Sequence, residues 1–206
     1  MVVCFIGNQS SIGSRPHLAA VKTSLNLSKV LKNMPEDTQR KLLDMIAREE
    51  IKSIPHKFAR GLDRCERALI ESCFHPDGID DHGFFRGNAE EFCDWVLEEL
   101  KKYDASQHII GTQNVELSGD TAFCESYFIA VHMIPNPKGA TELIVAGRYL
   151  DTMENRDGDW KITLRRCVFD WNRMTDALPI PPRDPDPRCT GTRYPEDESY
   201  SSFFKR

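Results

Sequence analysis

Residues 58 to 87, FARGLDRCERALIESCFHPDGIDDHGFFRG, contain the change of pattern from which the fold can be predicted. The first part continues a helix, and residues 66 to 73 follow as a second, short helix that His75-Pro76-Asp77-Gly78 interrupts. The last part, Ile79 to Arg86, is typical of a strand with a turn. This stretch therefore predicts a chain that passes from helices to a sheet.

Asp63 lies at an unusual place in this stretch. It follows apolar residues whose spacing predicts the core-facing stripe of a helix, namely Ile46, Ile51, Ile54, Phe58 and Leu62. A carboxylate at the edge of such a stripe is half buried and needs a partner. We expect that partner to be His108, in the segment SQHIIG, with the rest of the chain building a pocket around the two.

The composition is that of a globular domain with extensions. The chain has 206 residues and a net charge of −5, which argues against non-specific nucleic-acid binding. No apolar run reaches the ~20 residues of a membrane span, and the N-terminal segment lacks the basic region of a signal peptide. The seven cysteines have no C-x-x-C spacing, so we expect reduced core thiols and a cytoplasmic protein.

Three parts can be distinguished along the chain. Residues 1–34 show no sustained period and are expected to form a variable N-terminal extension. Residues 35–174 form the domain, and residues 175–206, rich in Pro, Asp and Arg, form an extended C-terminal tail. Pro55 is expected to kink the first long helix or to start a new one.

Within the domain, the period changes from helical to alternating near residue 105. An amphipathic helix is expected over Ala89 to Tyr103, and long strands over His108–Leu117, Thr121–Ile134, Leu143–Arg156 and Trp160–Trp171. Segregated helices and strands indicate an α+β fold. We expect a cone-shaped α+β barrel, in which a curved antiparallel sheet of four to six strands packs on the N-terminal helices and leaves a cavity.

Several segments in this order resemble the nuclear transport factor 2-like superfamily, and within it the SnoaL-like branch. They are the R-G-x-D-R segment with its following F-H-P-D, the GFFRG strand end, the hairpin QHIIGTQNVEL–SGDTAFCESYFIA and the segment GRYLDTMENRDGDWKI. The branch holds polyketide cyclases, scytalone dehydratase, bile-acid 7α-dehydratases and the hexachlorocyclohexane dehydrochlorinase. The resemblance covers Asp37 to Trp171 and implies a cone of curved sheet closed by helices, assembled as a homodimer or homotrimer.

The resemblance also implies where the reacting groups lie. In dehydratase and dehydrochlorinase members, an aspartate at the end of the first long helix pairs with a histidine that opens a central strand. Asp63 and His108 are at the matching places, and Arg165 matches an arginine that lines the dehydrochlorinase pocket. Phe58 departs from the pattern, because catalytic members often have Tyr or Lys there. No leaving-group role is therefore carried over to Phe58.

A His–Asp pair supplies a general base near neutral pH, because the carboxylate sets the tautomer of the ring and stabilises the imidazolium. We expect His108 to abstract a proton from carbon while Asp63 orients the ring. Structural interpretations stay open beside this one. Asp63 could cap a helix or pair with Arg60 or Arg64, and His108 could be a structural histidine at a strand edge.

Five further residues are candidates for substrate binding: Phe58, His82, Tyr127, Arg148 and Trp171. Aromatic strand residues could flank a planar ligand but are usually core. Arg165 and Arg166, as neighbours on a strand, must point to opposite faces. His82, beside Asp80 and Asp81, could line the cavity mouth or cap a turn. The spacing of these groups matches no closed metal site, so we expect no metal.

These features favour a cofactor-independent lyase. It would remove a proton and a leaving group from a hydroxylated aromatic, cyclic or steroid-like small molecule, with no nucleic acid or membrane as partner. An isomerase or cyclase that uses the same pair is one alternative. A non-catalytic module for hydrophobic-ligand binding or assembly is another, since the superfamily contains such proteins. This last alternative predicts that Asp63 and His108 do not touch.

Overall fold

The computed structural model describes residues 33–177 and 191–200. The chain divides into two compact units, residues 1–39 and 40–206, and the fold below is that of the second unit. The elements in order are α2 (Glu36–Arg64), α3 (Arg67–Glu71), β1 (Phe74–Asp81), β2 (Arg86–Asn88), α4 (Ala89–Leu100), β3 (Ala105–Ser118), β4 (Thr121–Asn136), β5 (Gly139–Arg156), β6 (Asp159–Ala177) and the 3-10 turn η2 (Glu198–Tyr200). Their order confirms the predicted α+β class.

Helix α2 presents one apolar stripe to the core and ends beside the candidate site. The buried members of the stripe are Ile51, Ile54, Phe58 and Leu62. Pro55 lies inside the helix, which continues past it, so no new helix starts there. At the end, the Glu66 backbone N–H donates to the Gly61 carbonyl (2.8 Å) and Cys65 has a φ of 53°. This left-handed closure terminates the helix.

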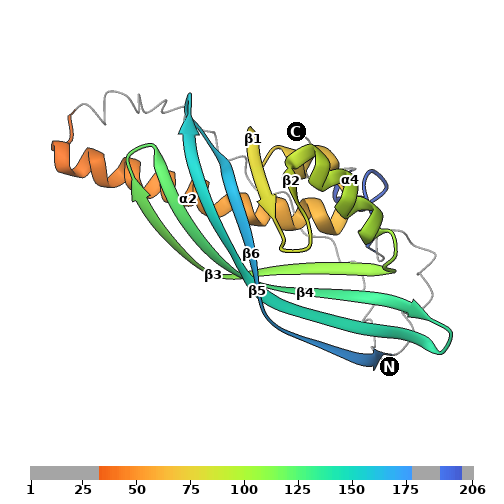
Figure 1. Cartoon of the computed structure of the whole chain (residues 1–206). Coiled ribbons are helices and arrows are strands. Elements are labelled where there is room, and N and C mark those ends of the chain that lie inside the picture. The colour runs from red at the N-terminus through yellow and green to blue at the C-terminus, as the bar shows by residue number, and fades with distance from the viewer. Residues whose placement is uncertain (1–32, 178–190, 201–206) are drawn as a thin grey trace, which may run out of the picture. The chain divides into compact units, whose positions relative to one another are not determined.

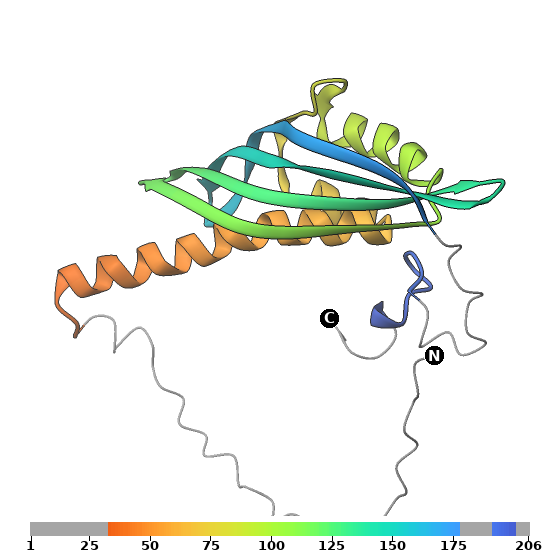
Figure 2. The same cartoon turned by 90° about the horizontal axis from the view of Figure 1, so that it is seen from below.

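Six strands form one curved sheet in the order β2-β1-β6-β5-β4-β3. Neighbouring strands are antiparallel except β1 and β6, which are parallel. Figures 1 and 2 show the long strands β3 to β6 sweeping past α2, with α4 beside the short strands β1 and β2. The sheet curves without closing. The predicted cone of curved sheet packed on helices is confirmed, with one parallel pair in addition.

Two bulges in β6 decide which of its residues face the helices. The register between β5 and β6 shifts between Thr152 and Met153 and again between Ala146 and Gly147. At each shift β6 contributes one extra residue, which moves its inward side chains by one position. A Cβ at Gly147 would lie 2.2 Å from the Val168 carbonyl oxygen, so the second bulge requires glycine. The buried or cavity-facing residues of β6 are Trp160, Ile162, Arg165, Cys167, Phe169, Asn172 and Met174.

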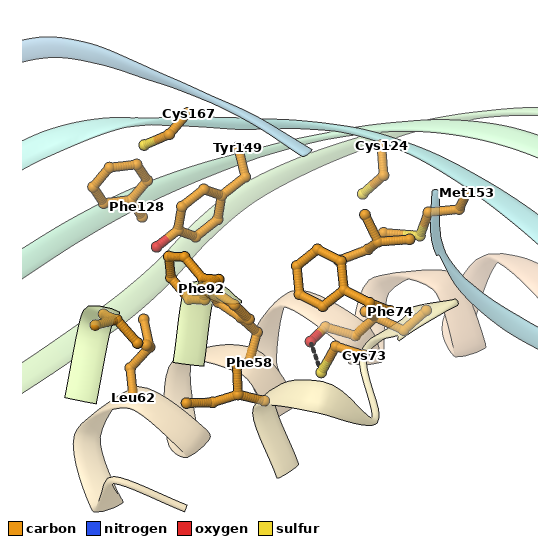
Figure 3. Close-up of a cluster of buried hydrophobic side chains, with 14 of the residues drawn as sticks. Phe58, Leu62, Cys73, Phe74, Phe92, Cys124, Phe128, Tyr149, Met153 and Cys167 are labelled. Atoms are coloured by element: carbon orange, nitrogen blue, oxygen red, sulfur yellow. Dashed lines mark hydrogen bonds between the residues drawn. The ribbon is translucent and has the colours of Figure 1, made fainter. Parts of the chain in front are cut away.

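The hydrophobic core lies between the helices and the sheet, with Phe58 at its centre. The ring centroid of Phe58 is 5.7 Å from that of Phe92, 5.7 Å from that of Tyr149 and 5.9 Å from that of Phe74. Figure 3 shows these side chains meeting between the two layers, with Phe128 beside Tyr149. Each large apolar side chain buried in this way stabilises the fold by ~1.5–3 kcal/mol.

One fully buried ion pair lies within this core. Arg165 donates from Nε and Nη2 to the two carboxylate oxygens of Asp151, both at 2.7 Å. The guanidinium lies 4.1 Å from the ring centroids of both Phe58 and Tyr149. Burial lowers the pKa of Arg165, but the charge of Asp151 outweighs this effect and raises the pKa above its ordinary value. Arg165 therefore stays cationic.

The described part of the C-terminal segment packs on the ends of two helices. Arg64 Nη1 donates to Asp197 (3.1 Å), and the Tyr200 hydroxyl donates to Glu66 (2.7 Å). Arg193 Nη2 donates to two carbonyl oxygens near the C-terminal end of α4, at 2.8 and 2.9 Å. These contacts anchor this part of the tail to the ends of α2 and α4.

The expected N-terminal extension lies almost entirely outside the described residues, as do Cys4 and Cys189. The other five cysteines are free, and four of them are buried. Burial raises the pKa of the Cys73 thiol to about 11 and that of Cys93 to about 12. Across the described ranges, no helix has the length and apolar character needed to span a membrane.

Candidate active site

A cavity of about 590 Å³ lies between α4, the end of α2 and the sheet. Its wall is mostly apolar and aromatic, with Phe92 and Trp95 from α4 and Phe128 and Phe169 from the sheet. The polar residues on the wall are His82, Glu99, Tyr103, His108, His132, Tyr149 and Asn172. An apolar cavity of this size with a few polar groups is typical of a small-molecule site.

Asp63 and His108 meet at this cavity. His108 Nδ1 lies 2.7 Å from Asp63 Oδ1. The backbone N–H of His108 also donates to the same carboxylate, at 2.9 Å to Oδ2 and 3.1 Å to Oδ1. The side chains are only 7% exposed for His108 and 12% for Asp63. The carboxylate at the end of α2 thus holds both the ring and the backbone of β3 at one point.

This arrangement assigns the tautomer of His108. Because Asp63 is an ionised acceptor, Nδ1 carries the proton and donates it, which leaves the lone pair on Nε2. His108 lines the cavity, and Nε2 is the ring nitrogen that Asp63 does not hold. A neutral imidazole with a free Nε2 is the form that can accept a proton.

His132 lies next to His108 on the cavity wall. Their ring centroids are 5.4 Å apart, and the ring of Tyr103 covers His132 at 4.6 Å. Burial, with the nearby His108 as a second cause, lowers the pKa of His132 to about 4. His132 is therefore neutral at neutral pH and adds no positive charge beside His108.

His82 occupies the part of the wall formed by α4 and the end of β1. Its Nδ1 is hydrogen-bonded to Asp80 Oδ1, and Asp80 is completely buried. The ring stacks on Phe92 with centroids 5.0 Å apart. Of the five residues expected to bind substrate, His82 alone lines the cavity within the described ranges.

The other expected site residues lie elsewhere. Arg165 points inward, as its expected role requires, but it is bound to Asp151 and does not line the cavity. Phe58 lies in the core beneath the cavity. Tyr127, Arg148 and Trp171 are on the outer face of the sheet, because their strand neighbours Phe128, Tyr149 and Asn172 point inward. On that face Arg148 pairs with Glu125 and Asp170.

Sequence reasoning did not identify several cavity residues. Trp95 lies in the amphipathic helix expected over Ala89 to Tyr103 but was not proposed as a site residue, and the structure makes it part of the wall. Tyr149 and His132 were not proposed at all. Alternation along β4 and β5 could have found them, because His132 has the same parity as Phe128 and Ala130. In the part of the chain that the structure describes, no group of three or more His, Cys, Asp or Glu side chains could hold a metal.

Comparisons with known proteins agree with this fold. A family model described as a SnoaL-like domain matches residues 44–166. No curated protein matches the chain.

Many solved structures resemble the chain, and three are representative. A hexachlorocyclohexane dehydrochlorinase, LinA-type3, from Novosphingobium barchaimii is 16% identical, with 69% of this chain and 99% of that chain covered and a TM-score of 0.61. A protein provisionally assigned as a scytalone dehydratase from Novosphingobium aromaticivorans is 18% identical, with 68% and 97% covered and a TM-score of 0.56. A protein of unknown function from Mycobacterium tuberculosis is 20% identical, with 62% and 73% covered and a TM-score of 0.53. At these identities the likeness concerns the fold alone.

Proposed function

The chain belongs to the SnoaL-like domain family, and on this premise we propose that it is a cofactor-independent lyase of the dehydratase type. Its substrate would be a hydroxylated aromatic, cyclic or steroid-like small molecule. The proposal rests on one observation, the contact of 2.7 Å between His108 Nδ1 and Asp63 on the wall of an apolar cavity. Proteins of known and unknown activity share this fold, so the site rather than the fold carries the argument.

In this mechanism His108 is the general base. Nε2 takes a proton from a carbon atom of the substrate, and the electrons of that C–H bond form the new double bond as the leaving group departs with its own bonding pair. The imidazolium that forms is stabilised by Asp63, whose negative charge lies against Nδ1–H. Asp63 stays deprotonated throughout. Its role is to orient the ring of His108 and to balance the positive charge of the imidazolium.

The cavity wall supports an apolar and cyclic substrate. Rings of Phe92, Trp95 and Phe128 offer flat surfaces for a planar ligand, and the hydroxyl of Tyr149 and the amide of Asn172 offer a few hydrogen bonds. The volume of about 590 Å³ lies within the ~300–1,000 Å³ of pockets that bind small organic ligands. The mostly apolar wall lowers the local dielectric constant, which strengthens the charge interaction between Asp63 and the developing imidazolium.

The proposal can be separated from its alternatives. An isomerase or cyclase would use the same base but release no water, so the mass of the product distinguishes the two reactions. A pure binding module would not need the pairing of Asp63 with His108, whereas the two side chains are in contact.

The test uses His108→Ala, Asp63→Asn and the double variant, each checked for folding by circular dichroism. Turnover is measured on a panel of hydroxylated aromatics and sterols. Each single change should lower turnover by the ~10²–10⁴-fold that general-base catalysis contributes, and the double variant should be little worse than the worse single. Asp63→Asn is informative because the amide oxygen can still accept from the His108 backbone while the charge is lost.

The matched control is His56→Ala, which removes an exposed histidine of α2 that does not line the cavity. It should leave turnover unchanged. Full activity in folded His108→Ala would overturn the assignment of His108 as the base.

A further inference from the structure

His82 and His108 come from distant parts of one sheet to one cavity. His82 directly follows β1, while His108 is in β3, and four neighbouring steps separate these strands in the sheet order. In a flat sheet with ~4.8 Å between strands, four steps span roughly 19 Å. Both residues line the same cavity because the sheet curves. A ligand in the cavity therefore lies between two histidines supplied by different strands.

The environment of His82 repeats the main feature of His108. In both residues Nδ1 contacts an aspartate, Asp80 for His82 and Asp63 for His108. In both, Nε2 is the nitrogen left for a ligand. The ring of His82 is further held by Phe92, whose plane is inclined by only 26° to it. Two oriented imidazoles thus face one cavity.

The carboxylates behind the two histidines differ in burial: Asp63 is 12% exposed and also accepts from the His108 backbone N–H. Among the described residues, Asp80 is completely buried and its Oδ2 has no hydrogen-bond partner. Asp80 is opposite Arg165 in the register of β1 with β6, and Arg165 is bound to Asp151. These three side chains are completely buried. Two carboxylates and one guanidinium leave one negative charge in the core, and burial of an unbalanced charge is costly. A proton on His82 brings this buried group to neutrality.

Among the residues that the structure describes, the other titratable groups around His82 supply no such positive charge. Burial raises the pKa of Tyr149 well above its ordinary value and raises that of the thiols Cys93 and Cys167, so all three are neutral at neutral pH. On β1, Asp81 lies 3.7 Å from Arg86 and belongs to the surface. On α4, Glu99 lines the cavity and pairs with Lys102 at 2.6 Å.

We propose that His82, held by Asp80, is a second catalytic residue that carries a proton in the resting protein and donates it to the leaving hydroxyl of the substrate. This inference deepens the proposed lyase function and rests on it. His108 and His82 then form a base and an acid on two sides of the substrate. Arg165 is a positioning residue in this scheme, because it acts on His82 only through Asp80.

The elimination moves one proton to His108 and one proton from His82, and it releases water. His108 Nε2 removes a proton from the carbon, the C–H electrons form the double bond, and the C–O bond breaks with its electrons on oxygen. His82 Nε2–H donates its proton to that oxygen, so that water leaves. His108 ends protonated and His82 neutral, and one proton returned through solvent restores both. No oxidant or reductant is needed.

The two histidines also narrow the substrate class. The hydroxyl must reach His82 while a C–H bond on the adjacent carbon reaches His108. A rigid cyclic alcohol satisfies both contacts, because its ring fixes the relative direction of the C–O and C–H bonds. Flexible chains would lose conformational entropy on adopting this arrangement. We therefore expect ring alcohols to be better substrates than open-chain alcohols of similar polarity.

The charge of His82 can be measured without a substrate. The full chain is labelled with ¹⁵N-histidine, and two-bond ¹H–¹⁵N correlation spectra distinguish an imidazolium from each neutral tautomer. The chain has six histidines, and signals are assigned by their loss in His82→Gln and His108→Gln. His56→Gln serves as the control for assignment, since its loss should leave the spectra of both cavity histidines unchanged.

At pH 7 the proposal requires His82 to be an imidazolium in the wild type and to become neutral in Asp80→Asn. A neutral His82 in the folded wild type overturns it, and so does a His82 that stays charged in folded Asp80→Asn. If Asp80→Asn does not fold, the wild-type spectrum alone decides. The same spectra report on His108 separately: an imidazolium at His108 would count against the general base and leave the result for His82 intact.

Discussion

Replacing Arg165 by methionine tests how the buried charges are organised. The change keeps much of the side-chain length but removes both hydrogen bonds to Asp151, each of 2.7 Å. It also removes the cation between Phe58 and Tyr149, whose ring centroids lie 4.1 Å away. Asp151 then remains completely buried without a partner, beside the equally buried Asp80.

Removing one partner of a buried ion pair typically costs ~3–5 kcal/mol, because the other charge is left uncompensated. A domain of ordinary stability unfolds with ~5–15 kcal/mol, so a loss of ~3–5 kcal/mol in Arg165→Met is more than half of the total at the low end of that range. The double variant Arg165→Met/Asp151→Leu removes both charges and should recover most of that loss. The expected result is thus a coupling between the two positions, with the double variant more stable than Arg165→Met.

The assay is urea unfolding followed by circular dichroism, with the midpoint and slope fitted for each variant. Arg67→Met is the matched control, because Arg67 of α3 pairs with Glu71 and with the exposed Asp94 on the helix side of the domain, away from the outer sheet face. It should unfold close to the wild type. A loss below ~1 kcal/mol in Arg165→Met, or no recovery in the double variant, would contradict the account of a compensated buried pair.

Three other predictions concern the cavity and the assembly. His82→Gln should slow elimination of a hydroxyl group by ~10²–10⁴-fold. It should hardly slow elimination of chloride from the same ring, because chloride leaves without a proton. Equal losses of rate on the two substrates would refute an acid role for His82. Because the pKa of His132 falls from 6.5 to about 4 on folding, the unfolded chain binds more protons between these values. Stability should therefore drop by roughly 3 kcal/mol at most as pH falls from 6.5 towards 4, and His132→Gln should lack this drop in urea titrations. Trp171 is 53% exposed and Ile129 40% exposed on the outer sheet face, so we expect a homodimer or homotrimer to cover that face; light scattering that gives a monomer mass at micromolar concentration would exclude it.

The main outline of the fold could be predicted from periodicity. The buried stripe of α2 follows the helical spacing of its apolar residues, and its end places Asp63 where a helix gives way to a turn. The strands β3 to β6 follow their two-residue alternation and short turns. Asp63 and His108 could be paired only through the resemblance to a known family, because nothing local in the sequence links residues 45 positions apart.

Which side of the sheet each strand residue points to could not be predicted, because each β-bulge shifts the alternation by one residue. With strict alternation from Ile162, Leu164 and Arg166 would point inward, yet the first bulge of β6 turns Arg165 inward instead. The second bulge shifts the inward positions again and turns Trp171 outward. Phe169 lines the cavity, so alternation would direct Trp171 there as well, but the extra residue gives that place to Asn172.

His82 illustrates a different limit. The run Asp80-Asp81-His82 has the composition of a solvated turn, and its charges suggest the surface. Burial of Asp80 becomes understandable only through Arg165, which is distant in sequence and paired with Asp80 by the parallel contact of β1 with β6. A parallel neighbour in a sheet is set by tertiary packing, so local sequence reasoning has no access to it.

The anchoring of the C-terminal segment has a consequence for how the protein is produced. A truncation after Ala177 would keep every residue that lines the cavity, so the binding site alone would give no reason to extend the protein further. It would nevertheless delete Asp197 and Tyr200, the partners of Arg64 and Glu66, immediately after the residue that orients His108. Such a shortened protein would have a frayed helix end beneath its general base. Expression boundaries for activity measurements should therefore extend through residue 200.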